Sequence, residues 1–357
     1  MPNVGKSTLF NSLSSAKAQS ANYPFCTIEP NLGVITVPDE RLNKLAELVN
    51  PQNVVPNTIE IVDIAGLVKG ASKGEGLGNQ FLANIRDTNA ILHVVRCFDD
   101  ENITHVDGSV DPVRDKEVID FELQLKDLET VTNRISKVEK KAKSGEKAAQ
   151  KEFDLLTRLK ETLEQGKSAR IVEPKNEDEE LLLSAFQLLT TKPVLYIANV
   201  DEDSIQEGND YVEQLKAAIA EEGAGLLMVC AKIESEIVEL DDVDERKEYL
   251  GMYGLSEPGV NIIIRGAYNL LNLKTYFTAG EKEVRAWPFP DGYKAPQTAG
   301  VIHTDFERGF IKAEVISYND YVALGSEQAA KEAGKMRMEG KEYLVKDGDV
   351  MHFKFNV

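Results

Sequence analysis

Residues 2–8, close to the start of the chain, read P-N-V-G-K-S-T and are the first with an evident chemical use. Where G-K-S-T opens a helix, the lysine can reach the outer phosphates of a nucleotide, the serine hydroxyl can bind Mg²⁺, and backbone amides point at the phosphates. The sequence therefore predicts a phosphate-binding loop in which Lys6 contacts phosphate and Ser7 contacts phosphate and metal. Taken alone, these residues also suit a simple glycine turn before a helix. The other contacts expected from this loop are Asn3, Val4, Gly5 and Thr8.

Two later segments supply the partners that such a loop requires. Thr27, at the end of Y-P-F-C-T, offers a second hydroxyl for Mg²⁺, and Asp63 follows an apolar stretch, where a carboxylate can hold Mg²⁺ through water. Gly66 ends D-I-A-G and offers an amide that senses the γ-phosphate, so we expect Gly66 and Lys6 to act in catalysis. Leu67 occupies the place of the glutamine that orients water in many GTPases, and its side chain cannot hydrogen-bond. Another group must therefore position the water, or turnover must be slow.

His105 is the candidate for that missing group. It lies in a polar segment, N-I-T-H, after a predicted strand, and it is one of four histidines in the chain. An imidazole can orient or deprotonate a water molecule at neutral pH. The alternative is an ordinary loop histidine exposed to solvent.

The choice of nucleobase is predicted from residues 199–202, which read N-V-D-E. Guanine-binding proteins use N-K-x-D, in which the aspartate accepts from two guanine N–H groups. Here Val200 replaces the lysine and the longer Glu202 replaces that aspartate, which should spoil a paired contact of the kind worth ~1–3 kcal/mol. We therefore expect ATP rather than GTP, with Asn199 and Ala231 beside the base.

A mostly parallel sheet must position these motifs. Several short stretches are rich in Val, Ile and Leu along their whole length, as is typical of strands buried on both faces. Helical stretches at 40–49 and 211–222 alternate with them, so the predicted fold class is α/β, doubly wound. The strand that feeds a phosphate-binding loop would precede Met1, so we expect this first strand to be missing. The predicted strands are 33–37, 58–62, 91–96, 193–198 and 226–230.

The alternation stops between about residues 111 and 190. Apolar residues there recur at steps of three and four from Val118 to Leu163, with a turn at Ser144-Gly145, which predicts an antiparallel helical hairpin inserted into the first domain. Lysines crowd its tip. A solvated helix face is the favoured interpretation over an RNA contact. These lysines are Lys137, Lys140, Lys141, Lys143, Lys147 and Lys151.

From about Asn272 the pattern predicts a small α+β module. The lone tryptophan, Trp287, is expected in its core. The β-like stretches are 284–287, 299–302, 313–317, 343–345 and 350–355.

Composition narrows the class of protein further. The chain has 357 residues, of which 42% are hydrophobic and 28% charged, which suits globular domains. Three well-separated cysteines predict reduced thiols and a cytosolic setting, and we expect no membrane segment. The formal charge of −19 argues against indiscriminate nucleic-acid binding, and we expect no DNA partner.

In combination, the motifs resemble those of the YchF-type Obg-like ATPases over the whole chain. The resemblance rests on P-N-V-G-K-S-T, Y-P-F-C-T-I-E-P-N, D-I-A-G-L-V-K-G-A-S-K-G-E-G-L-G-N-Q-F, N-V-D-E, H-T-D-F-E-R-G-F and K-D-G-D-V-M-H-F-K-F-N-V. It implies a P-loop G domain (residues 1–110 and 191–271), a coiled-coil hairpin (111–190) and a β-grasp TGS domain (272–357). It also implies ATP hydrolysis with Mg²⁺ and association with ribosomes. Asn3 matches an asparagine of potassium-stimulated relatives, which implies K⁺ as a further cofactor.

Two alternatives to a slow, nucleotide-switched ATPase stay open at this point. One is an ATP-gated module that binds ribosomes or RNA with negligible hydrolysis, which Leu67 favours. The other is a GTPase of the same fold.

Overall fold

A computed structural model describes residues 2–15, 32–64 and 77–356. The predicted site residues Thr27 and Gly66, and Leu67, which follows Gly66 in the sequence, lie outside these ranges. Contacts divide the chain into two compact units, Met1–Ser12 with Val62–Ile263, and Leu13–Ile61 with Ile264–Val357. In this division residues 13–61 group with the C-terminal part of the chain, residues 111–190 are not separated from the first unit, and the second unit resumes at Ile264 and not at Asn272.

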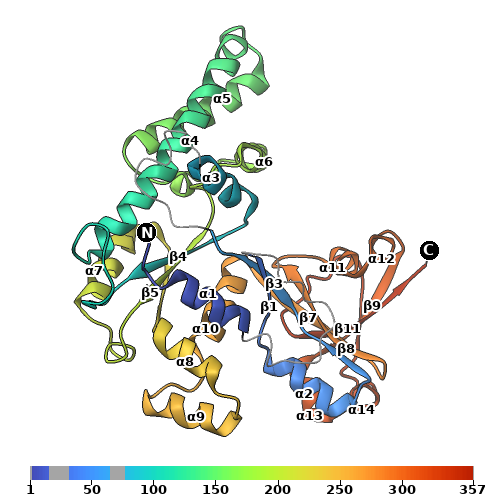
Figure 1. Ribbon diagram of the computed structural model, residues 1–357. Coiled ribbons are helices and arrows are strands. Elements are labelled where there is room, and N and C mark those ends of the chain that lie inside the picture. The colour runs from blue at the N-terminus through green and yellow to red at the C-terminus, as the bar shows by residue number, and fades with distance from the viewer. Residues whose placement is uncertain (1, 16–31, 65–76, 357) are drawn as a thin grey trace. The chain divides into compact units, whose positions relative to one another are not determined.

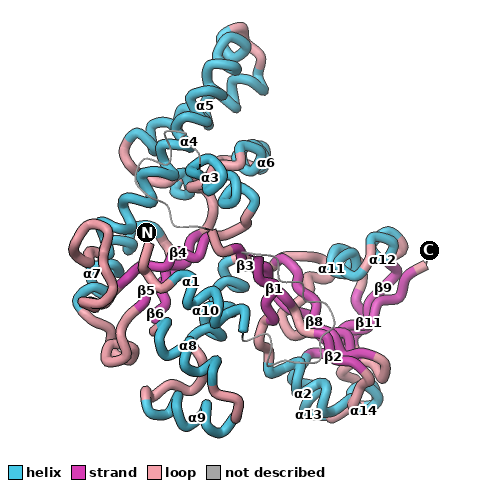
Figure 2. Tube along the Cα trace, in the orientation of Figure 1, coloured by secondary structure: helices cyan, strands magenta, loops and turns pink. Residues whose placement is uncertain are grey.

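A parallel three-stranded sheet organises the first unit (Figures 1 and 2). Its strands are β4 (Ile91–Arg96), β5 (Val194–Asn199) and β6 (Gly225–Val229), and all six residues of β5 are buried. Because Arg96 pairs with Asn199 and Asn199 with Val229, the three strands end at one edge of the sheet. The loops after these strands therefore begin side by side. The helices of this unit outside the hairpin are α1 (Lys6–Ser15), α3 (Leu77–Asp87), α7 (Asp210–Ile219), α8 (Ala231–Glu239), α9 (Val243–Met252) and α10 (Gly259–Leu270), of which α1 and α10 run on into the second unit.

The predicted hairpin is present as α4 (Pro112–Lys143) and α5 (Lys147–Glu164), with a short turn at Gly145 between them (Figure 1). Asp111 caps α4 by accepting from the amide of Arg114 at 3.0 Å, and Pro112 suits the first turn because its missing N–H needs no partner there. The two helices pack through buried apolar side chains, and the short helix α6 (Glu177–Phe186) follows. The buried side chains include Val131, Leu155, Leu156, Leu159 and Leu163.

A six-stranded mixed sheet forms the second unit, in the order β10-β9-β11-β7-β8-β2. Strand β11 is parallel to β7 and antiparallel to β9, and β2 is parallel to β8. Strands β1 (Leu32–Thr36) and β3 (Thr58–Val62) form a separate pair. The strands of the larger sheet are β2 (Asn53–Val55), β7 (Leu273–Ala279), β8 (Glu283–Pro290), β9 (Phe310–Ser317), β10 (Arg337–Glu339) and β11 (Asp349–Phe355).

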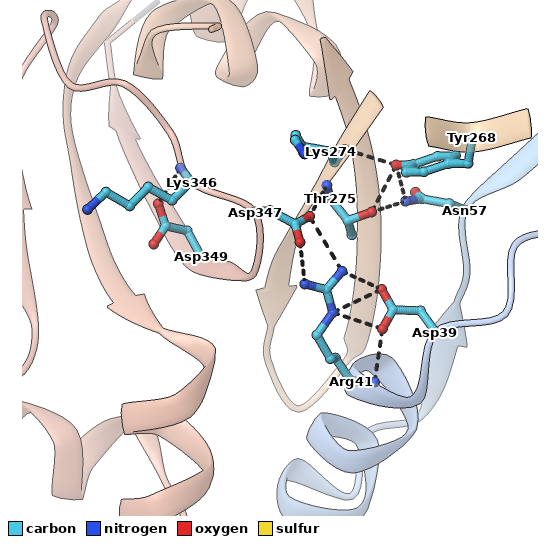
Figure 3. Close-up of polar contacts among 9 residues, drawn as sticks. All are labelled: Asp39, Arg41, Asn57, Tyr268, Lys274, Thr275, Lys346, Asp347 and Asp349. Carbon is cyan, nitrogen blue, oxygen red and sulfur yellow. Dashed lines mark hydrogen bonds and ion pairs between the residues drawn. The ribbon is translucent and has the colours of Figure 1, made fainter. Parts of the chain in front are cut away.

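An ion-pair junction ties residues 39–57 to strand β7 in this unit (Figure 3). Arg41 lies between Asp39 and Asp347, with 2.7 Å from its Nη1 to Asp347 Oδ2, and Asp347 also accepts from the Thr275 amide at 2.8 Å. Asn57 Nδ2 donates to the Thr275 hydroxyl at 2.9 Å. These bonds hold helix α2 (Glu40–Val49) and strand β2 on the C-terminal sheet.

Two predicted strands are wrong. Residues 299–302 belong to helix α11 (Ala295–Ile302), which begins because Pro296 occupies its first turn and the Gln297 side chain accepts from the Lys294 amide at 2.9 Å. Residues 343–345 do not form a strand either, and pair through a single bridge between Lys294 and Leu344. Helices α12 (Thr304–Arg308), α13 (Tyr318–Leu324) and α14 (Glu327–Glu332) complete the unit.

Candidate nucleotide-binding site

The predicted phosphate-binding loop leads directly into helix α1, which begins at Lys6. Gly5 has a φ of +87°, in the left-handed region that favours glycine, and its carbonyl accepts from the Leu9 amide at 3.0 Å. Ser7 is exposed at the open end of the helix, where backbone amides lack helical partners. Lys6 forms an ion pair with Asp63, so the structure brings together two residues that the sequence places 57 positions apart.

Asn199 joins this loop to the start of helix α8, which follows β6. Its side-chain Nδ2 donates to the Val4 carbonyl at 2.9 Å, and its Oδ1 accepts from the Ala231 amide at 2.9 Å. The residue is 2% exposed. A Cβ on Gly5 would lie 2.2 Å from Asn199 Nδ2, so this close approach is a second reason for glycine here, in addition to its positive φ. Asn199 was predicted beside the base, and the structure shows that both its polar atoms hold the backbone of the site.

The remaining residues of N-V-D-E point in different directions. Val200 is buried, and its amide donates to Val229 at 2.9 Å. The Asp201 carboxylate accepts from the Ser204 amide at 2.9 Å. The Glu202 carboxylate forms an ion pair with Lys232, and this hydrogen bond holds the pKa of Glu202 below its usual range although partial burial opposes the shift. Lys232 follows Ala231 in helix α8.

His105 is 8% exposed, in contrast to the exposed loop residue that the alternative required. Its Nε2 lies 2.7 Å from Asp115 Oδ2, and its Nδ1 accepts from the Asp107 amide at 3.1 Å. The loop stands close to the phosphate-binding loop, because Asn3 Nδ2 donates to the Thr104 carbonyl at 3.1 Å. The structure therefore brings His105 near the residues predicted to hold phosphate.

Arg96, at the end of β4, shapes the loop that leads to His105. Its guanidinium is buried, with 1% of the residue exposed, and donates to the carbonyls of Phe98 at 3.0 Å and Ile103 at 2.9 Å. It also lies over the Phe98 ring, 4.7 Å from the centroid. No motif suggested Arg96, although a charged residue at the end of a buried apolar strand is itself a signal.

Ligand atoms of His105, Asp107 and Asp115 lie within 4.8 Å of one another, a spacing that a metal ion could use. The Arg114 guanidinium already lies 3.1 Å from Asp115 and 3.8 Å from Asp107. This positive charge offsets part of the charge of the two carboxylates, and we assign no metal to the cluster.

Comparison with known proteins places this geometry in a family. A family model described as a 50S ribosome-binding GTPase matches residues 1–134, and the model of the YchF GTPase C-terminal region matches residues 273–356. The chain is 56% identical over 359 residues to the ribosome-binding ATPase YchF of Bacillus subtilis, covering 100% of this chain and 98% of that protein. The chain belongs to the YchF family.

Other relatives agree with this assignment. The YchF protein of Escherichia coli O157:H7, also named a ribosome-binding ATPase, is 57% identical over 357 residues, with the same coverage. A solved structure of the Schizosaccharomyces pombe YchF GTPase has a TM-score of 0.89 at 39% identity, covering 99% of this chain and 96% of that one. A GTP-binding protein of Pyrococcus horikoshii, at 19% identity and a TM-score of 0.61, supports the fold alone. The predicted YchF resemblance and α/β P-loop fold class are confirmed.

Several expectations stay predictions within the YchF frame. These are the three domain boundaries, the K⁺ site and the individual roles of the site residues. Among the described residues, no helix combines the length and apolar character needed to cross a membrane. Cys97 and Cys230 are buried free thiols, and burial raises the pKa of Cys97 to about 12.

Proposed function

We propose that this chain is a slow ATPase that acts on the ribosome in the cytoplasm, with ATP binding at the start of helix α1 as its switch. Relatives that are 56% and 57% identical over the whole chain are named ribosome-binding ATPases. The observation that carries the proposal is the meeting of Gly5, Lys6 and Asp63 at the open end of α1, braced by Asn199.

The residues at this helix end fit a nucleoside triphosphate with Mg²⁺. Lys6 supplies an ammonium group, Ser7 a hydroxyl and Asp63 a carboxylate, which is the donor set that a phosphate chain and a hard cation require. In the structure Lys6 and Asp63 form an ion pair with each other. A bound phosphate would replace Asp63 as the partner of Lys6, and the Asp63 carboxylate would then be available to the cation. Mg²⁺, when bound, would neutralise charge that develops on the phosphate oxygens.

The Glu202–Lys232 pair supports ATP over GTP. A carboxylate that is already engaged by an ammonium group is a poorer acceptor for the two N–H groups of guanine. Adenine has no such pair of N–H donors at this edge of the site, so the Glu202–Lys232 pair does not weaken its binding. Glu202 follows β5, and Ala231 begins helix α8 after the neighbouring strand β6, so we propose that a base lies between them.

His105 is proposed to orient the attacking water and to accept its proton. The support is its position beside the phosphate-binding loop, through the bond from Asn3 to Thr104. In the structure both ring nitrogens are engaged, so the Asp107 amide must give way before the ring can contact water.

Two measurements test this function. The first is competition of ATP and GTP for the chain with Mg²⁺, in which we expect ATP to bind at least tenfold more tightly; equal affinity would instead support a GTPase of this fold. The second is single-turnover hydrolysis with and without ribosomes. Acceleration by ribosomes supports the enzyme cycle, and slow hydrolysis that ribosomes leave unchanged supports an ATP-gated binding module.

Although the sequence pattern favoured a solvated helix face, we propose a contact with ribosomal RNA at the hairpin tip, because its lysines are exposed in the structure. All six lysines at the tip are exposed, and of these Lys143 and Lys151 form ion pairs with Glu139 and Asp178. The tip is thus a basic region on a chain of net charge −19, which suits a phosphate backbone. Changing Lys137, Lys140, Lys141 and Lys147 to Gln should weaken ribosome binding and flatten its salt dependence. The matched change of four exposed lysines outside the hairpin, Lys216, Lys247, Lys331 and Lys341, should do neither; an equal effect would contradict the contact.

A further inference from the structure

We infer that Asp115 is a positioning residue that fixes the tautomer and direction of His105, an inference that rests on the catalytic role proposed for His105. The first observation is the pattern of hydrogen bonds around the imidazole. A backbone N–H can only donate, so His105 Nδ1, which receives the Asp107 amide at 3.1 Å, is the unprotonated nitrogen. The ring proton is therefore on Nε2 and faces the Asp115 carboxylate at 2.7 Å.

The hydrogen bond between His105 and Asp115 is shielded from water. Asp115 is 2% exposed and His105 is 8% exposed, so few solvent molecules compete for either group. The other carboxylate oxygen of Asp115 accepts from Arg114, at 3.3 Å from Nε and 3.1 Å from Nη2. A buried carboxylate with all its partners in place holds one geometry, whereas a partly satisfied one would be costly.

The pair also has a rigid attachment at the hairpin. Asp115 lies in the first turn of α4, where its amide donates to the Asp111 carbonyl at 3.0 Å, and Arg114 is held at the same turn by the Asp111 side chain. On the other side of His105, the Thr104 carbonyl accepts from Asn3 of the phosphate-binding loop. His105 therefore lies between the predicted phosphate site and the base of the hairpin, and Asp115 fixes it to the hairpin.

This arrangement determines which nitrogen can serve the reaction. With the proton on Nε2 held by Asp115, the lone pair available to water is on Nδ1, once the Asp107 amide withdraws. In the hydrolysis step the water oxygen bonds to the γ-phosphorus, the bond from that phosphorus to the bridging oxygen of ADP breaks, and the water proton passes to Nδ1. The Asp115 carboxylate then stabilises the imidazolium until the proton leaves to phosphate or solvent, as an orienting carboxylate does for a histidine base.

A double-mutant cycle tests this role. In the Asp115→Asn chain we expect the hydrolysis rate to fall by about tenfold or more while the KM for ATP is unchanged, a size typical of a partner that orients a catalytic group. In the His105→Ala background the same change should have no further effect, because residues that act as a unit are not additive. Asp120→Asn is the matched control, since Asp120 lies on the same helix and pairs with Lys116 at 2.7 Å. We expect its effect to be equal in both backgrounds.

A second readout separates this inference from the proposed function. NMR of ¹⁵N-labelled histidine should show His105 protonated on Nε2 in the starting chain, and a changed tautomer population in Asp115→Asn. If hydrolysis is unchanged in His105→Ala, the catalytic role fails, and the NMR result alone decides whether Asp115 positions the ring. Equal rate losses from Asp115→Asn in both backgrounds, or an unchanged tautomer, would overturn the inference. Thermal unfolding checks that each variant is folded, and Asp115→Glu serves as a second variant with the charge retained.

Discussion

Two polar junctions join distant segments of this chain, and they are built in opposite ways. In the first unit, the neutral amide of Asn199 connects Val4 with Ala231 and is 2% exposed. In the second unit, the charged Arg41 side chain connects Asp39 with Asp347 and is 30% exposed (Figure 3). One junction depends on buried hydrogen bonds and the other on charges that water can still reach.

The two junctions differ in whether water can solvate the groups that lose a partner when a contact is removed. Without Asn199, the Val4 carbonyl and the Ala231 amide are stranded away from water, and each such group costs ~1–3 kcal/mol. Around Arg41, burial alone would lower the pKa of the guanidinium, but its hydrogen bonds and charge interactions with Asp39 and Asp347 raise it above the usual value. Water can solvate those groups if one is removed. We therefore expect that removing Asn199 abolishes the stability provided by its junction in one step. Removing one partner of Arg41 should cost only part of the stability that its junction provides.

The largest effect is expected from Asn199→Ala. Two stranded backbone groups should destabilise the first unit by about 2–5 kcal/mol, and ATP affinity should fall at least tenfold because the phosphate-binding loop loses its support. Denaturant unfolding and ATP titration measure the two effects. Asn133→Ala, at an exposed position of α4, is the control and should change neither. A loss of stability with full ATP affinity would separate Asn199 from the nucleotide site.

An intermediate effect is expected from Asp347→Ala. Arg41 loses one partner and the Thr275 amide loses its acceptor, so the second unit should lose about 1–2 kcal/mol of stability. Added salt should reduce the difference, because the ion pair is partly exposed. ATP affinity should be unchanged.

The control for this change is Glu47→Gln, which removes the exposed pair with Lys44 and should have no measurable effect. If Asp347→Ala destabilises the chain as strongly as Asn199→Ala, the contrast between a buried and a hydrated junction is wrong. The comparison requires denaturant curves for both variants at the same two salt concentrations.

Local sequence predicted the elements well where the pattern is set by burial alone. The wholly buried strand β5 and the apolar seam of the hairpin lie within a residue or two of the predicted positions, because periodicity reports burial directly. Residues 299–302 were misread as a strand because the helix start depends on Pro296 and on a Gln297 cap over Lys294, a residue that is not a usual cap. The placement of β2 on the C-terminal sheet depends on pairing with β8, more than 200 residues away, and no local pattern records it.

The residues of the candidate site also differ in whether the sequence alone could predict them. That Lys6 and Asp63 lie together could be predicted from the spacing of the motifs, whereas the phosphate and metal roles of Lys6, Ser7 and Asp63 stay proposals. Asp115 and Arg96 could not be predicted, because they act on the site through hydrogen bonds to His105 and to loop carbonyls, for which many residue types at many spacings would serve.

The smallest effect is expected from Lys232→Ala, which tests whether an exposed pair can matter for specificity when it adds little to stability. Lys232 is exposed, so its loss should leave the unfolding curve unchanged. It would, however, free the Glu202 carboxylate to accept from the two N–H groups of guanine, and we expect the preference for ATP over GTP to fall by about two- to fivefold. The matched change Lys216→Ala, which breaks the exposed pair with Glu213, should leave the ratio unchanged. A preference that is unaltered in both variants would mean that the length of the Glu202 side chain, and not its partner, excludes guanine.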